Sequence, residues 1–349
     1  MAANRFDALR LLFAATVAVY HLVVLASLAP GSSVERLFAE AAHVSIQGFF
    51  IISGALVLGS WERSASWRTY LEKRVRRLYP AYAVIILVPT ATAVLMGRDL
   101  MGIAHYLGAN LVFLNFLAPT LPGVFEGQRF EAVNGALWTL KIEVLFYAAL
   151  LVLAPCLVWA RRRGWALWFL IGLGLGGEAW RLAFLTFAPP EQASISAILA
   201  RQLPGQMAFF AGGMALWVFR HSLKSRTAGL GLIGLVCLAA GIVVPEGIVL
   251  RPLGLSLLVA FAAWHPGPQI PAARHGDISY GIYICHFPII QMLVSAGVFE
   301  TSPAFGALAA SGLTLGAACL LWRFVEKPAL RADSHYRTAD RIRSPVSAP

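Results

Sequence analysis

The sequence carries little charge for its length, and acidic residues are the scarcer kind. Of its 349 residues 13% are charged and 58% are hydrophobic, with 17 Asp and Glu against 28 Lys and Arg. A soluble domain of ordinary composition has about 25% charged residues, so the shortage excludes that class and indicates a polytopic membrane protein. The basic residues stand in short clusters between apolar runs, where the positive-inside rule predicts them. We therefore expect a lipid bilayer, and no nucleic acid, among its partners.

The sequence also has few cysteines, and none of them forms a recognisable pattern. Cys156, Cys237, Cys285 and Cys319 each stand alone in an apolar segment, without metal-ligand spacing or the pairing of a secreted disulfide framework. Isolated cysteines of this kind behave as small packing residues. We expect no metal site.

Two further absences bear on domain organisation. The first apolar run is not followed by a small-residue cleavage site and a polar segment, so we expect it to stay in place as a membrane anchor. No linker, internal repeat or low-complexity tract divides residues 1–328, which predicts a single all-helical membrane domain. Residues 329–349 are rich in Arg, Ser and Pro and are predicted to form a disordered cytoplasmic tail.

What the sequence does contain is a series of long apolar runs. A membrane-spanning helix needs about 20 predominantly apolar residues, and ten runs approach or reach that length. They lie near residues 6–28, 41–60, 79–97, 136–159, 165–187, 202–219, 227–243, 248–264, 278–298 and 304–323. A further piece, residues 103–118, is shorter, contains His105, Asn110 and Asn115, and ends at Pro119.

The basic clusters decide how this shorter piece is treated. Basic residues before the first run and the cluster at residues 63–77 place the N-terminus and the second loop in the cytoplasm. If residues 103–118 crossed the membrane, the arginines at 161–163 would face outward. If that piece only dips into the membrane, every basic cluster falls inside. The prediction is therefore an all-α protein with about ten spans, both termini cytoplasmic, and an outward-facing insert at residues 98–135 that partly re-enters the bilayer.

The first apolar run contains two polar residues that share a helix face. Eleven positions separate Arg10 from His21, which places them within roughly 20° around a helix and about 16 Å apart along it. A polar side chain inside a span is costly and usually faces the protein interior or a cavity. Two interpretations stay open: a functional pair, or an interfacial arginine with a structural histidine bonded to a neighbouring helix.

A carboxylate is expected at a similar depth in a second run. Glu143, in the stretch LWTLKIEVLFY, and His21 both lie about 10 Å below the outer surface if each residue advances ~1.5 Å. A carboxylate beside an imidazole orients the ring and stabilises its protonated form, which improves a general base. The alternative is an interhelical pair that only holds helices together.

Two other segments are candidates for binding and support. The stretch EKRVRRLYP, at the loop that enters the third run, puts four basic residues in five positions, with Arg74 and Arg77 one helical turn apart. Such a cluster suits a polyphosphate, although topology or lipid headgroups alone would also explain it. In HGDISYGIYICHFPI, His286 is expected mid-membrane beside Tyr280 and Tyr283, as a structural or a catalytic histidine.

Taken together, these motifs resemble the membrane-bound acyltransferase-3 family, which acylates sugars on bacterial envelope and secreted molecules. No single motif is specific, but the set follows the family's order along nearly the whole chain. The motifs are FDALR with His21, GFFIISG at 48–54, RVRRLYP at 74–80, LWTLKIE ending at Glu143, ISYGIYICHFP ending at Pro288, and RFVEKP at 323–328. The chain departs from the family pattern at Leu11, Lys141, Val144 and Cys285.

The resemblance implies roles for individual residues. Arg10 and His21 match the family's essential pair, Glu143 its acidic residue, and Arg74 and Arg77 its cytoplasmic arginine pair. The implied donor is acyl-CoA, most simply acetyl-CoA, with its phosphates on these arginines and assisted by Lys73 and Arg76. The implied acceptor is a carbohydrate, free or lipid-linked, at the bacterial inner membrane. The short stretch after the last run leaves no room for a further domain, which favours the branch resembling exopolysaccharide and O-antigen O-acetyltransferases.

The expected reaction is an O-acyl transfer in which His21, assisted by Glu143, takes the proton of a sugar hydroxyl. A route through an acylated His21 is the alternative, and direct transfer is favoured. The oxyanion donor is left open among six residues: Ser45, Gln47, Ser53, Asn110, Tyr280 and His286. A competing function is a secondary transporter or flippase, because intramembrane His and Glu occur there too. A structural or lipid-binding partner of a polysaccharide assembly complex is a second.

Overall fold

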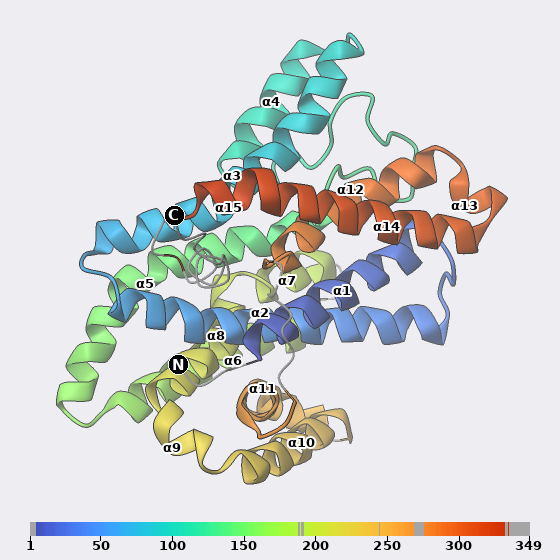
Figure 1. Ribbon diagram of the computed structural model, residues 1–349. Coiled ribbons are helices and arrows are strands. Elements are labelled where there is room, and N and C mark those ends of the chain that lie inside the picture. Colours follow the sequence, from blue (N-terminus) through green and yellow to red (C-terminus); the bar gives the residue numbers. More distant parts are fainter. Residues whose placement is uncertain are drawn as a thin grey trace, which may run out of the picture. The chain divides into compact units, whose positions relative to one another are not determined.

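The computed structural model of the chain describes residues 5–187, 189, 192–243, 245–268, 276–331 and 334. Most of these residues are helical, and they include no β-strand apart from an isolated bridge between Leu121 and Val124 (Figure 1). The prediction of an all-α fold is confirmed. The predicted disordered tail, residues 329–349, is described only at 329–331 and 334, so most of it lies outside the described residues.

Each of the ten apolar runs coincides with a helix. The helices are α1 (Phe6–Leu25), α2 (Ser33–Glu62), α3 (Trp67–Leu95), α5 (Trp138–Arg162), α6 (Ala166–Thr186), α8 (Leu203–Val218), α10 (Thr227–Val243), α11 (Arg251–Trp264), α12 (Ser279–Ser295) and α14 (Pro303–Leu321). Shorter elements join them: α4 (Leu100–Leu111), α7 (Ala193–Ala200), α9 (Arg220–Lys224), α13 (Val298–Thr301), α15 (Lys327–Ala329), η1 (Gly135–Leu137), η3 (Pro245–Leu250) and the π-helix η4 (Trp322–Glu326).

Among the described residues, five helical segments are both long and apolar enough to cross a bilayer. They are Phe6–Leu25, Ser33–Glu62, Trp67–Leu95, Gly135–Arg162 and Pro303–Ala329. The chain is a membrane protein on this evidence, while the count of ten spans and the cytoplasmic placement of both ends stay predictions.

One boundary differs from the sequence prediction. The basic stretch at residues 72–80 was expected in the loop before the third span, but it lies within α3, which begins at Trp67. Helix-forming residues such as Leu, Glu, Lys and Arg fill this stretch, and charge does not stop a helix from extending beyond the apolar core. The arginines are therefore carried on a helix, where their spacing determines which of them share a face.

The chain forms two compact units, each defined by its internal contacts. Unit 1 comprises residues 1–10, 44–70 and 142–270, and unit 2 comprises residues 11–43, 71–141 and 271–349. The single domain expected over residues 1–328 stays a prediction.

In unit 1, glycines allow helix backbones to approach one another closely. A Cβ at Gly213 of α8 would lie 1.9 Å from the carbonyl oxygen of Ile51 on α2, and a Cβ at Gly54 would lie 2.1 Å from that of Phe210. Small residues at helix contacts are the usual way that membrane helices pack. Arg5 then caps the C-terminal end of α11 by donating to the carbonyl oxygens of Ala262, His265 and Pro268.

In unit 2, α12 packs beside α14, and a Cβ at Gly281 would lie 2.8 Å from the Cα of Ala318 (Figure 1). The backbone of α12 is interrupted at Pro288, which has no N–H to donate to the carbonyl of Ile284. Asn134 supplies the missing donor, because its side-chain amide nitrogen lies 2.8 Å from that oxygen. This bond anchors α12 to the segment that precedes η1.

The predicted insert at residues 98–135 consists of α4 and an irregular segment. Asp99 caps α4 by accepting from the backbone N–H groups of Met101 and Gly102. The buried amide of Asn110 donates to the carbonyls of Tyr106 and Ala118, each at 2.8 Å. Irregular backbone at membrane depth has to be satisfied by protein in this way. Re-entry of the insert into the bilayer stays a prediction.

Candidate functional site

Two histidines from distant parts of the sequence meet in unit 2. Nδ1 of His21 on α1 lies 2.8 Å from Nε2 of His286 on α12, and the two rings are nearly parallel with their centroids 4.9 Å apart. His286 is completely buried, whereas His21 is partly accessible. The pair therefore combines a partly accessible histidine with a completely buried one.

The neighbours of this pair restrict the ring of His21. The ring of Phe287 meets it edge-on, with centroids 5.1 Å apart. Phe287 itself packs over Gly135, where a Cβ would lie 2.8 Å from the phenyl ring, so only glycine leaves room for it. Nδ1 of His286 lies 3.0 Å from the carbonyl oxygen of Ile282, one turn back on α12. Both imidazoles are held by identified contacts.

Glu143 belongs to unit 1, where a serine of α2 is its hydrogen-bond partner. The hydroxyl of Ser53 donates to Oε1 of Glu143 at 2.7 Å, and Ser53 is buried. Glu143 is partly buried, and a carboxylate that loses hydration needs such a donor to compensate. Because His21 and Glu143 belong to different units, their predicted contact stays a prediction.

Other candidates for oxyanion donor are distributed over both units. Ser45 and Gln47 are buried on α2, and Oε1 of Gln47 accepts from Nε of Arg251 at 2.8 Å. The two amide hydrogens of Asn110 are used within the insert, and the hydroxyl of Tyr280 donates to the carbonyl of Leu78. The structure thus gives Asn110 and Tyr280 identified structural bonds.

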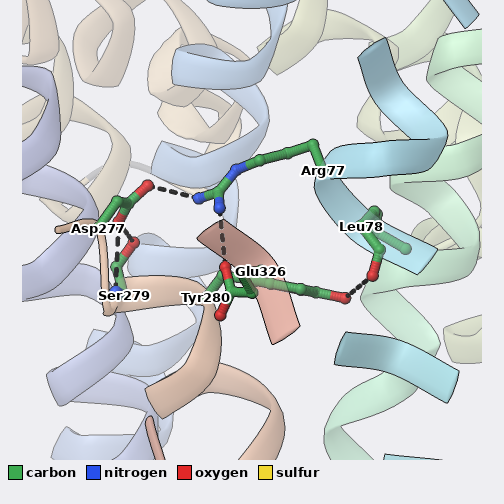
Figure 2. A network of polar contacts seen from close by, with 6 residues as sticks. All are labelled: Arg77, Leu78, Asp277, Ser279, Tyr280 and Glu326. Carbon is green, nitrogen blue, oxygen red and sulfur yellow. Dashed lines mark hydrogen bonds and ion pairs between the residues drawn. The ribbon is translucent and has the colours of Figure 1, made fainter. Parts of the chain in front are cut away.

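The arginine predicted to bind phosphate at position 77 lies between two carboxylates (Figure 2). Its Nη1 donates to Glu326 at 2.8 Å and its Nη2 to Asp277 at 2.5 Å. The side chains of these acids are 1% and 2% exposed, and that of Arg77 is 13% exposed. Arg77, Asp277 and Glu326 are well shielded from water. Loss of any one of them would leave an uncompensated charge in a poorly solvated site, which is energetically costly.

Local structure explains how the two acids reach Arg77. Gly276 has φ +112°, and a Cβ there would lie 1.9 Å from the indole nitrogen of Trp322, so the chain can turn against η4 only with glycine at this position. Asp277 follows directly, and Glu326 ends η4. Ser279 orients Asp277 by donating from its hydroxyl at 2.5 Å and its backbone N–H at 3.2 Å.

The remaining basic residues of this segment of α3 are closer to the surface. Nε of Arg76 donates to Glu72 at 2.8 Å, and Glu72 also accepts from Arg331 at 2.8 Å. Arg76 is exposed, and Lys73 and Arg74 are half-buried. The predicted anion site therefore contains carboxylates as well as cations, because Arg76 and Arg77 each form an ion pair with an acidic side chain.

Sequence reasoning did not assign a role to Asp277 or Glu326. Their scarcity could have drawn attention to them, because only 17 acidic residues occur in the chain. Both also lie inside motifs that were noted for other residues. Within the described ranges, no three His, Cys, Asp or Glu side chains gather as a metal site would require.

Apolar helices that carry histidine, arginine and acidic side chains in their interior are typical of membrane proteins whose function lies inside the helical bundle. The family model of acyltransferase 3, described as an acyltransferase domain, matches residues 4–323. The chain belongs to this family, and it is an acyltransferase.

Two relatives match over nearly their full length. Nodulation protein 10 of Rhizobium leguminosarum bv. viciae is 28% identical over 364 residues, which cover 94% of this chain and 93% of that protein. An O-acetyl transferase of Shigella phage Sf6 is 28% identical over 350 residues, which cover 95% and 97%. No solved structure matches the chain.

Proposed function

We propose that the chain is an integral-membrane O-acyltransferase of the bacterial inner membrane. It transfers an acetyl or similar short acyl group from cytoplasmic acyl-CoA to a sugar hydroxyl of an envelope or secreted polysaccharide or its lipid-linked precursor. The name of the phage relative supports acetyl as the group and oxygen as the acceptor atom. The observation that carries the proposal is a partly accessible His21 held against the buried His286 in a member of an acyltransferase family.

In the proposed reaction His21 acts as a general base. It removes the proton of the sugar hydroxyl while the oxygen attacks the thioester carbonyl, and the C–S bond then breaks. The proton returns from His21 to the departing CoA sulfur, so the products are an O-acyl sugar and free CoA thiol. The proposed reaction balances without a metal ion or a redox partner.

Glu143 and Arg10 have supporting roles in the proposal. Glu143 stabilises the imidazolium that His21 forms during the reaction, and Ser53 holds the carboxylate in place through the bond of 2.7 Å. Arg10 lies on the same face of α1 as His21 and attracts the anionic donor. The phosphates of CoA bind at the cytoplasmic end of α3, where Lys73, Arg74 and Arg76 lie beside Arg77.

The experiment that tests the function supplies membranes containing the chain with acetyl-CoA labelled in the acetyl group. We expect label in a carbohydrate fraction, release of an equal amount of CoA thiol, and loss of the label in mild alkali, since esters are cleaved where amides survive. A transporter or a structural partner would release no CoA. CoA release without label in any carbohydrate would contradict the proposed acceptor.

The Ser53–Glu143 pair leads to a graded prediction. We expect Glu143→Gln to lower kcat on the order of 10- to 100-fold, because a hydrogen bond to a charged group contributes about 1.5–3 kcal/mol. Ser53→Ala leaves the charge in place and is expected to cost less. Ser256→Ala, which removes a buried hydroxyl bonded within its own helix, is the matched control. Equal kcat for Glu143→Gln and wild type would remove Glu143 from the mechanism.

A second prediction concerns donor binding at α3. We expect Arg74→Ala to raise KM for acetyl-CoA about 10-fold with kcat changed little, because a phosphate contact acts equally on the ground and transition states. The same substitution should leave KM unchanged for a pantetheine thioester that has no nucleotide phosphates. A rise of KM for both donors would show that Arg74 acts on the protein rather than on phosphate.

A further inference from the structure

We propose that His286 is a positioning residue that makes Nε2 of His21 the nitrogen that accepts the proton. This inference rests on the proposed function, because it assumes that His21 is the base. It goes further by assigning a tautomer to each ring and a reacting atom to one of them.

The backbone of α12 determines the tautomer of His286. Nδ1 of His286 lies 3.0 Å from the carbonyl oxygen of Ile282. A carbonyl oxygen can only accept a hydrogen bond, so Nδ1 of His286 carries the proton. In a neutral imidazole the other nitrogen is then an acceptor, and Nε2 of His286 therefore presents a lone pair.

That lone pair faces His21. The contact of 2.8 Å joins Nε2 of His286 to Nδ1 of His21, and two lone pairs at this distance would repel each other. Nδ1 of His21 must therefore carry a proton and donate it to His286. The remaining nitrogen of His21, Nε2, bears the lone pair and is the atom that can take a proton from a hydroxyl.

Burial makes this orientation persistent. His286 has no exposed surface and His21 is packed edge-on against Phe287, which sits over Gly135. Rotation of His21 would break its bond to His286 inside this packing and leave a buried polar atom without a partner, which is costly. The chain of bonds runs from the carbonyl of Ile282 through both rings, and it ends at a single basic atom.

The same chain assists proton transfer. When Nε2 of His21 gains the hydroxyl proton, the imidazolium donates through Nδ1 to a neutral acceptor, and a bond from a charged donor is stronger than one from a neutral donor. When the CoA sulfur leaves, Nε2 returns its proton to the sulfur and the original tautomers are restored.

Two substitutions at His286 separate positioning from packing. Glutamine places an amide oxygen near the position of Nε2 and still accepts from His21, whereas leucine has similar bulk and no acceptor. We expect His286→Gln to keep kcat within about 10-fold of wild type and His286→Leu to lose on the order of 100-fold or more, with KM for acetyl-CoA unchanged in both. Equal kcat for the two variants, whether high or low, would overturn the proposal.

The tautomers can also be measured directly in the unmodified chain, which does not depend on variants that fold. Protein labelled with 15N-histidine is placed in lipid nanodiscs at about pH 8.5, where an ordinary histidine, with a pKa of about 6.5, is neutral. Signals are assigned by their disappearance in the His21→Gln and His286→Gln proteins. We expect Nδ1 to carry the proton in both rings; a proton on Nε2 of either ring would contradict the proposal.

Different results would contradict the role of His21 as the base and the role of His286 as a positioning residue. If His21→Gln retains wild-type acyl transfer, the proposed mechanism fails whatever the tautomers are. If His21→Gln is inactive and the 15N signals show a proton on Nε2 of His286, only the positioning role fails.

Discussion

Replacing His21 with glutamine is expected to lower kcat for acyl transfer by about 10²- to 10⁴-fold. Glutamine can donate to His286 through its side-chain amide but has no nitrogen basic enough to take a hydroxyl proton, and general-base catalysis contributes an effect of that size. The measurement is label transfer from acetyl-CoA at saturating donor. KM for acetyl-CoA should change little, because His21 does not contact the phosphates in the proposal.

The control for this loss is a histidine outside the pair. His105 is exposed in the insert, and His105→Ala should keep wild-type kcat. The thermal unfolding midpoint of His21→Gln in nanodiscs should also match wild type, which separates chemistry from folding. A His21→Gln protein that is correctly folded and fully active would contradict the role of His21.

The second large effect is expected at Arg77 and is one of stability. Arg77→Ala removes the cation between Asp277 and Glu326, which are 2% and 1% exposed. Removing one member of a buried ion group typically destabilises a protein by about 3–5 kcal/mol. We therefore expect Arg77→Ala to unfold at a markedly lower temperature or to be recovered in low amount, and the neutral triple variant Arg77→Ala, Asp277→Asn, Glu326→Gln to regain part of the loss.

The direction in which KM for acetyl-CoA changes separates this structural role from phosphate binding. If Arg77 served mainly to bind phosphate, Asp277→Asn would release it from a competing anion and lower KM for acetyl-CoA. If Arg77 holds the segments together, Asp277→Asn should destabilise the protein and leave KM unchanged or raised. Glu72→Ala, which breaks exposed pairs with Arg76 and Arg331, is the control, because each exposed pair contributes about 0–1 kcal/mol. A lower KM in a stable Asp277→Asn protein would contradict the structural role.

Helix positions were predictable from the sequence because long apolar runs in membrane proteins favour helices, which satisfy their own backbone. All ten runs coincide with helices, whereas the count of ten spans stays a prediction. Helix ends were less predictable. α2 begins at Ser33, before its apolar run at 41–60, and α3 begins at Trp67, because charged helix-forming residues extend both helices beyond the apolar core.

Candidate residues could be named from the sequence, but their contacts could not, and Asp277 and Glu326, which contact Arg77, were not named. His21 and Glu143 stand out because polar groups are rare in apolar runs, and Arg77 stands out as a member of a basic cluster. Their observed partners are His286, Ser53 and the pair Asp277 and Glu326. Contacts between residues so far apart in the sequence depend on how the helices pack. They also depend on Gly135 and Gly276, and on Pro288, which leaves a carbonyl of α12 without its helical donor. Periodicity in a single sequence does not reveal these contacts.

The role of His21 in moving an acyl group from a CoA thioester to a hydroxyl can be tested by one rate. This is the initial rate of CoA thiol release by purified chain in nanodiscs, with and without a carbohydrate acceptor, for wild type and His21→Gln. We expect acceptor-dependent release from wild type and a rate near background from His21→Gln. Acceptor-dependent release at the same rate from both proteins would contradict the role of His21.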